Sequence, residues 1–206
     1  MAKKAESPKS KDRLLTEAKL LEAAEVVFSK EGFKGATTRI IAKKACCNLA
    51  LINRYFEGKY GLFLSLIEKK AEIVKSKDFV YPPQKTLTDE LICFGEFYLS
   101  NLTSNLNLFK IVTGQFLSDQ KFLKKFRDKL PLLEGNQVVE ERLDEFIKEG
   151  LISKKYTSKQ IVADIETYAL GLTLTKILIR GEDRNTVMDD LKTFITQYTR
   201  SLAPNE

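Results

Sequence analysis

The sequence contains no histidine and no tryptophan, and it has only five prolines and ten glycines among 206 residues. Without an imidazole, the chain cannot form a Ser-His-Asp triad, a histidine-ligated zinc hydrolase centre or a histidine pH sensor. Large classes of enzymes are thereby excluded. Few chain breakers, 43% hydrophobic residues and 30% charged residues are instead typical of an ordered, helix-rich globular protein.

Cysteine is scarce as well, with only Cys46, Cys47 and Cys93. These three form neither a CxxC pair nor the even set of a disulfide framework, which favours a reducing cytoplasm. No run approaches the roughly 18 apolar residues of a membrane span, and the basic N-terminus lacks the apolar core of a signal peptide. We therefore expect a cytoplasmic protein with no membrane partner.

The positive charge is concentrated at one end of the chain. Residues 1–60 contain 13 Lys and Arg against 7 Asp and Glu, whereas residues 61–206 contain 21 of each. A basic module attached to a neutral body indicates a polyanionic partner, with nucleic acid ahead of an anionic membrane. A solvated charge run with no partner is the alternative that charge alone leaves open.

Helical periodicity begins inside this basic segment. Apolar residues recur at spacings of three and four over residues 14–28, which predicts an amphipathic helix that Gly32 stops. Thr37 and Thr38 then form a capping pair for a short second helix that reaches Ala45.

A third short helix is expected over residues 49–56, preceded by the capping residue Asn48 and ended by Gly58. A fourth helix starts near Lys59. Two short helices joined by a turn are typical of a helix-turn-helix, in which one helix fits the major groove of DNA. Because any small helical bundle contains such a pair, periodicity alone leaves a purely structural role open.

The rest of the chain is also predicted to be helical. Pro82 and Pro83 break the pattern, and no segment has the alternation of a strand. Further helices are expected at about residues 87–102, 106–116, 118–130, 132–149, 158–179 and 187–202. Ser158 is expected to cap the fifth of these, and Pro131 to separate the third from the fourth. The fold class is therefore all-α, with about nine helices when the run that Pro131 interrupts is counted once.

The segment LLEAAEVVFSKEGFKGATTRIIAKKACCNLALINRYFEGKYGLF resembles the N-terminal signature of the TetR/AcrR family of one-component transcriptional regulators. The resemblance covers about residues 14–66. It rests on Ala23, Ala24, Phe28, Gly32, Phe33, Thr37, Thr38, Ile41, Ala42, Tyr55, Phe56, Lys59 and Leu62. It implies a DNA-binding protein.

The resemblance also implies which residues contact DNA. Thr38 would cap the second helix and bind a phosphate, Arg39 would reach a phosphate or a guanine edge, and Lys59 would pair with a phosphate. The remaining candidates lie in and just before the third helix: Asn48, Leu49, Ala50, Leu51, Asn53 and Tyr55. Two of them have plainer alternatives, because Asn53 can be a solvated helix residue and Tyr55 can pack against its own module.

The turn before the third helix departs from the family pattern, which usually has glycine followed by an aliphatic residue. Here Cys46 and Cys47 occupy the two positions. The turn requires a positive backbone dihedral that a side chain resists, so Cys46 implies strain or an altered turn. A thiol redox switch is a minor alternative, and DNA binding that peroxide leaves unchanged would exclude it.

For the C-terminal two-thirds, the resemblance implies an effector pocket and a homodimer interface. Aromatic residues are the pocket candidates: Phe94, Phe97, Tyr98, Phe109, Phe116, Phe122, Phe126 and Tyr168. The last two helices supply the dimer candidates: Ile161, Ile165, Tyr168, Leu172, Val187, Leu191, Phe194, Ile195 and Tyr198. Both sets can equally be the core of one subunit.

The expected organisation follows from these observations. Residues 1–12 form a flexible basic arm, 13–58 the helix-turn-helix domain, 59–80 a connecting helix and 81–206 the effector-binding and dimerisation domain. The leading hypothesis is a dimeric repressor that binds operator DNA and is released by a small apolar or amphipathic effector, with no cofactor, metal or catalytic residue. A helical protein-interaction module with only non-specific DNA binding, a helical enzyme, and activation in place of repression are the alternatives.

Overall fold

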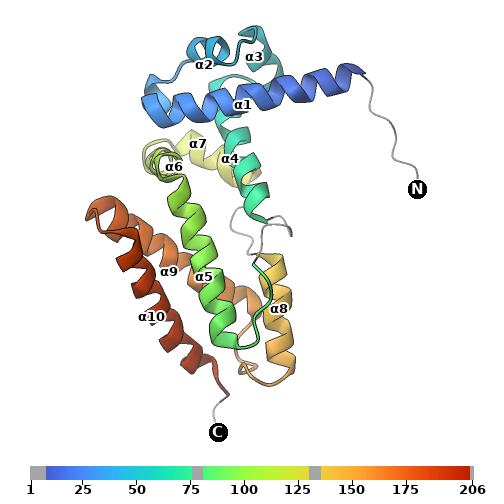
Figure 1. Cartoon of the computed structure of the whole chain (residues 1–206). Coiled ribbons are helices and arrows are strands. Elements are labelled where there is room, and N and C mark those ends of the chain that lie inside the picture. The colour runs from blue at the N-terminus through green and yellow to red at the C-terminus, as the bar shows by residue number, and fades with distance from the viewer. Residues whose placement is uncertain (1–7, 76–80, 130–135, 205–206) are drawn as a thin grey trace. The chain divides into compact units, whose positions relative to one another are not determined.

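A computed structural model describes residues 8–75, 81–129 and 136–204. Every regular element in these ranges is helical, with ten α-helices and one π-helical segment (Figure 1). The all-α class is thus confirmed. No helix within these ranges is both long and apolar enough to cross a membrane.

The helices form two compact units, and each unit is made of two separate stretches of the sequence. The first unit contains residues 1–70 and 110–129, and the second contains residues 71–109 and 130–206. The first unit is built from α1 (Pro8–Gly35), α2 (Thr38–Lys44), α3 (Ala50–Phe56), most of α4 (Lys59–Lys75), most of α6 (Leu106–Ser118) and α7 (Gln120–Lys129). Residues 110–129 therefore pack with the basic N-terminal helices, although the sequence division assigns them to the body beyond residue 81.

An aromatic cluster holds the first unit together. The Phe122 ring is fully buried and lies within 6.4 Å, centroid to centroid, of Phe33, Tyr60 and Phe63. Phe116 and Phe126 extend the cluster along α6 and α7. Such offset and edge-on pairs add to the large apolar area that the rings bury.

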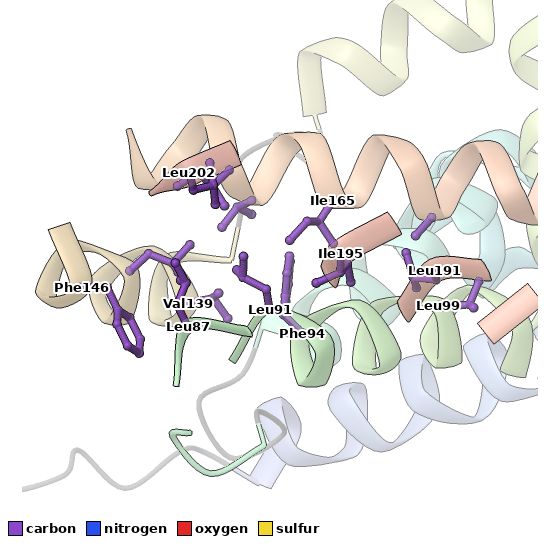
Figure 2. Close-up of a cluster of buried hydrophobic side chains, with 14 of the residues drawn as sticks. Leu87, Leu91, Phe94, Leu99, Val139, Phe146, Ile165, Leu191, Ile195 and Leu202 are labelled. Atoms are coloured by element: carbon purple, nitrogen blue, oxygen red, sulfur yellow. The ribbon is translucent and has the colours of Figure 1, made fainter. Parts of the chain in front are cut away.

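The second unit has an aliphatic core. It contains α5 (Leu87–Ser104), α8 (Gln137–Lys148), α9 (Ser158–Leu172), the π-helix η2 (Thr173–Ile179) and α10 (Arg184–Leu202). Figure 2 shows Leu91, Phe94, Ile165 and Ile195 converging from α5, α9 and α10. Gly95 permits this close packing, because a Cβ atom there would lie 2.5 Å from Ile195 Cδ1.

Several helix ends differ from the sequence expectation. α1 begins at Pro8, so the expected flexible arm is helical from residue 8 onward, and residues 1–7 lie outside the described ranges. Gly32 interrupts the helical dihedrals at φ 67°, yet α1 ends only at Gly35. The break expected at Pro131 also lies outside the described ranges.

Two capping assignments were wrong by one residue. Thr37 rather than Thr38 caps α2, with its Oγ1 accepting from the Ile40 amide at 3.2 Å. Thr157 rather than Ser158 caps α9, with its Oγ1 accepting from the Gln160 amide. In both cases the capping residue has extended dihedrals, which direct its oxygen at the free amides of the first turn.

The long helix expected over residues 158–179 changes character after Leu172. The last seven residues form the π-helix η2, and the hydroxyls of Thr173 and Thr175 donate to the carbonyls of Ala169 and Gly171. Hydroxyls that bind carbonyls four residues back compete with the regular ladder.

Candidate DNA-binding site

The helix-turn-helix expected from the sequence is present as α2 and α3. Asn48 Oδ1 accepts from the Ala50 amide at 2.8 Å, so Asn48 satisfies the first turn of α3 as expected. The turn between the helices is closed by the amide of Cys46 donating to Lys43 and that of Cys47 to Ala42. Cys46 adopts φ 53°, which confirms that a side chain occupies a backbone position suited to glycine.

A close contact between the backbones of Gly61 and Phe56 fixes the C-terminal end of α3. The chain leaves α3 through Glu57 in the left-handed region at φ 58° and turns directly into α4. At Gly61 a Cβ atom would lie 1.6 Å from the Phe56 carbonyl oxygen, so no other residue fits this backbone. This requirement was not recognised in the sequence, where the only signal is the GKYG spacing of two glycines.

α3 buries one side and leaves the other free. Ile52 and Phe56 face the core of the unit. The exposed residues of the helix are Ala50, Asn53 and Arg54, and Leu49 just before it is exposed too. A short side chain such as that of Ala50 permits close approach of a helix to base edges and to thymine methyl groups.

The other DNA-contact candidates differ in exposure. Arg39 and Asn48 are exposed, whereas Thr38 and Leu51 are half-buried. Tyr55 is half-buried too, and the Arg13 guanidinium lies 5.1 Å from its ring centroid. The structure thus brings the α1 residue Arg13 beside α3, a contact that nothing in the periodicity indicated.

Lys59 occupies a more internal position than the phosphate contact expected of it. Its ammonium donates to the carbonyls of Phe33 at 2.8 Å and Ala36 at 3.0 Å, and it lies 4.6 Å from the centroid of the Phe33 ring. Burial lowers the pKa of this ammonium. Lys59 therefore joins the end of α1 to the start of α4 and so holds the chain that follows α3 in place.

The eight pocket candidates fall into both units. Phe116, Phe122 and Phe126 belong to the aromatic cluster of the first unit. The others belong to the second unit: Phe94, Phe97, Tyr98, Phe109 and Tyr168. Phe94 is wholly buried, whereas Tyr98 is half-buried, and desolvation raises the pKa of its hydroxyl. For Phe94 and Phe122, the structure agrees with the core alternative.

The dimer candidates all lie in the second unit and differ in burial. Six are buried in the core of the second unit: Ile161, Ile165, Leu172, Val187, Leu191 and Ile195. Tyr168, Phe194 and Tyr198 remain half-buried and line a groove of about 540 Å³ along α9 and α10. Their rings are stacked, with centroids 3.7 Å apart for Tyr168–Phe194 and 5.6 Å for Phe194–Tyr198.

An all-helical chain whose second and third helices form a capped pair with one free side belongs to the class of helix-turn-helix proteins. Residues 20–66 match the family described as bacterial regulatory proteins, tetR family, which confirms the resemblance. Residues 20–66 are thus similar to the N-terminal domain of that family.

Relatives with curated descriptions agree over the same stretch. The chain is 40% identical over 57 residues to "Probable HTH-type transcriptional regulator YttP" of Bacillus subtilis, a match that covers 28% of either chain. It is 39% identical over 61 residues to "HTH-type transcriptional repressor SCO4008" of Streptomyces coelicolor, which covers 30% of this chain and 32% of the relative. The aligned part therefore spans about a third or less of each relative.

The likeness in fold extends much further than the likeness in sequence. The fatty acid degradation regulator FadR of Bacillus halodurans superposes with a TM-score of 0.64, and the match covers 93% of this chain and 96% of that one. The identity is only 18%. The helices beyond the N-terminal domain thus follow the same architecture with a different set of side chains.

Proposed function

We propose that this protein is a dimeric transcriptional regulator that binds operator DNA through α2 and α3 and acts as a repressor in the cytoplasm. The observation that carries the proposal is the capped helix pair with a free face within a strongly basic unit. The first unit contains 21 Lys and Arg against 10 Asp and Glu. An excess of that size attracts the phosphate backbone and releases its counterions.

The proposed DNA contacts divide into those that recognise bases and those that position the protein on the phosphate backbone. Arg39 and Asn53 are exposed and carry the hydrogen-bonding groups that discriminate bases. Leu49, Ala50 and Leu51 offer apolar contact to thymine methyl groups. Lys59 acts mainly by holding the start of α4, with phosphate pairing by its remaining donor as the second part of its role.

A second copy of the chain is the proposed occupant of the groove along α9 and α10. Exposed Leu170, Leu174 and Ile179 lie on the same helical segment as the stacked Tyr168. Two copies related by a two-fold axis would present two recognition helices to half-sites about 34–36 Å apart. We expect T167E combined with T175E, at two exposed residues that line the groove, to convert a dimer into a monomer in sedimentation equilibrium, whereas L151E, at an exposed leucine outside the groove, leaves the dimer intact. A monomeric wild type would refute this interface.

Release from DNA is proposed to follow the binding of a small apolar or amphipathic effector in the second unit. Such an effector must bind the DNA-incompetent form more tightly than the competent form, because equal affinity shifts no equilibrium. The aromatic residues of the second unit that keep some exposure, Phe97, Tyr98 and Phe109, are the proposed contacts.

The test is a binding profile of variants against an operator selected from random DNA. We expect R39A and N53A to change the preferred sequence, with about 1–3 kcal/mol lost at the bases that each contacts. K59A should weaken binding to all sequences alike. K30A, at an exposed lysine of α1, is the control. Binding that shows no sequence preference in the wild type would instead support an interaction module with non-specific DNA affinity.

A further inference from the structure

A pocket of about 310 Å³ lies inside the first unit, where the ends of α1 and α6 meet the first turn of α4. Its lining consists of Phe33, Lys34, Lys59, Tyr60, Gln115, Ser118 and Asp119. It contains none of the exposed residues of α3 and none of the aromatic residues proposed to contact the effector.

Gln115 is the least exposed polar residue that lines this pocket. It is only 9% exposed, and its side-chain amide makes no hydrogen bond with another residue in the described ranges. No buried side-chain nitrogen or oxygen in those ranges is left without a partner, so the amide atoms remain accessible from the pocket. The amide therefore presents both a donor and an acceptor to a molecule that enters it.

The charges around the pocket favour an anion. Lys34 is exposed and forms no ion pair within the part of the chain that the structure describes, and the Lys59 ammonium keeps one donor beyond its two carbonyl partners. Asp119 already accepts from the Tyr60 hydroxyl and from the amides of Lys121 and Phe122. The hydrogen bond from Tyr60 is the main reason why the pKa of Asp119 is lowered.

The walls of the pocket are partly aromatic. The rings of Phe33 and Tyr60 lie edge to face with centroids 4.8 Å apart. The volume is at the lower end of the range for small-molecule sites, about 300–1,000 Å³. A planar ring with one charged group suits both the walls and the size.

We propose that this pocket binds a small aromatic carboxylate, with the carboxylate paired to Lys34 and a polar ring substituent hydrogen-bonded to Gln115. The site goes beyond the proposed function, because it lies in the basic unit rather than among the effector contacts. Its existence does not depend on whether the chain reads an operator.

The experiment is isothermal titration calorimetry of the full chain with 4-hydroxybenzoate, its neutral analogue 4-hydroxybenzamide, and inorganic phosphate. The wild type should bind 4-hydroxybenzoate saturably and at least about tenfold more tightly than the neutral amide. Q115L should weaken binding about fivefold to tenfold through the lost hydrogen bond, and K34A about threefold. K30A, which removes an exposed lysine of the same helix outside the pocket, should bind as the wild type does.

A second substitution guards against a variant that fails to fold. Q115E keeps the size of the side chain and places a negative charge in the pocket, so it should abolish binding of 4-hydroxybenzoate, while circular dichroism reports the folded state. Equal affinity in all variants, no saturable binding to the wild type, or phosphate binding that is as tight and insensitive to Q115L would each overturn the proposal.

Discussion

The two units of this chain differ in charge and in the kind of core they bury. The first unit has a net charge of +11, from 21 basic and 10 acidic residues, and an aromatic cluster at its centre. The second unit has 13 basic and 18 acidic residues, a net of −5, and a mostly aliphatic core. Opposite charge on the two units means that a polyanion would be attracted to the first unit and repelled by the second.

The units also differ in where they place their ionic groups. In the second unit, the fully buried Glu90 accepts from the Tyr81 hydroxyl at 2.8 Å, from Arg142 Nη1 at 3.1 Å and from the Gln84 amide at 2.7 Å. In the first unit, exposed basic residues of α2 and α7 have no such buried partners: Arg39, Lys43, Lys44, Lys121, Lys124 and Lys125. Internal pairing stabilises a fold, whereas exposed like charge is available to a partner.

The largest expected effect comes from breaking the buried pair of the second unit. E90A should lower the free energy of unfolding by about 3–5 kcal/mol, because Arg142 and two further donors lose their acceptor. Urea unfolding followed by circular dichroism measures this. The control is E96A, at another glutamate of α5. It removes the half-exposed ion pair with Lys192 of α10 and should cost less than about 1 kcal/mol. Similar losses for both variants would show that burial of Glu90 is not decisive.

A comparable loss is expected from the core of the first unit. F122A should destabilise the protein by about 3–5 kcal/mol, because a fully buried ring is removed from the aromatic cluster. L117A, at a neighbouring side chain that is 81% exposed, should change stability by less than about 0.5 kcal/mol. If the melting temperature of F122A stayed close to that of the wild type, Phe122 would line a cavity rather than fill the core.

The smallest expected effect concerns the turn before α3, where a substitution should stabilise the protein instead of destabilising it. C46G should stabilise the protein by about 0.5–1 kcal/mol, since glycine adopts φ 53° without the cost that a Cβ atom adds. A45G is the matched control, because Ala45 has φ −75° and glycine there should cost about 1 kcal/mol. The denaturation midpoints of the two variants measure these changes. Destabilisation by C46G would mean that the contacts of the Cys46 thiol stabilise the protein by more than the backbone strain costs.

Much of this arrangement was predictable from local sequence. Helical spacing predicted the helices, and the capping pair Thr37–Thr38 together with Asn48 predicted where the two short helices begin. The strained turn expected at Cys46 is present as well. Residues 110–129 could not be assigned to the basic unit, because periodicity reports which side of a helix is apolar and not what it packs against. For the same reason, the apolar stripes of α9 and α10 did not separate a subunit core from a dimer surface.

The exposure of the candidate DNA-binding residues was predictable from the sequence, but their long-range side-chain contacts were not. Exposure of Arg39 and Asn53 follows from their places on short amphipathic helices, which sequence spacing gives. The internal carbonyl contacts of Lys59 and the stacking of Arg13 on Tyr55 join residues 23 to 42 positions apart, and no local pattern encodes them.

We propose that the basic unit reads DNA and that two copies do so together. DNase I footprinting of the purified protein on DNA upstream of its own coding sequence tests it most directly. We expect protection of an inverted repeat with half-sites about one helical turn apart, and we expect a variant that carries both R39A and N53A to lose this protection. Protection that is absent, or that spreads uniformly and disappears with moderate salt, would contradict it.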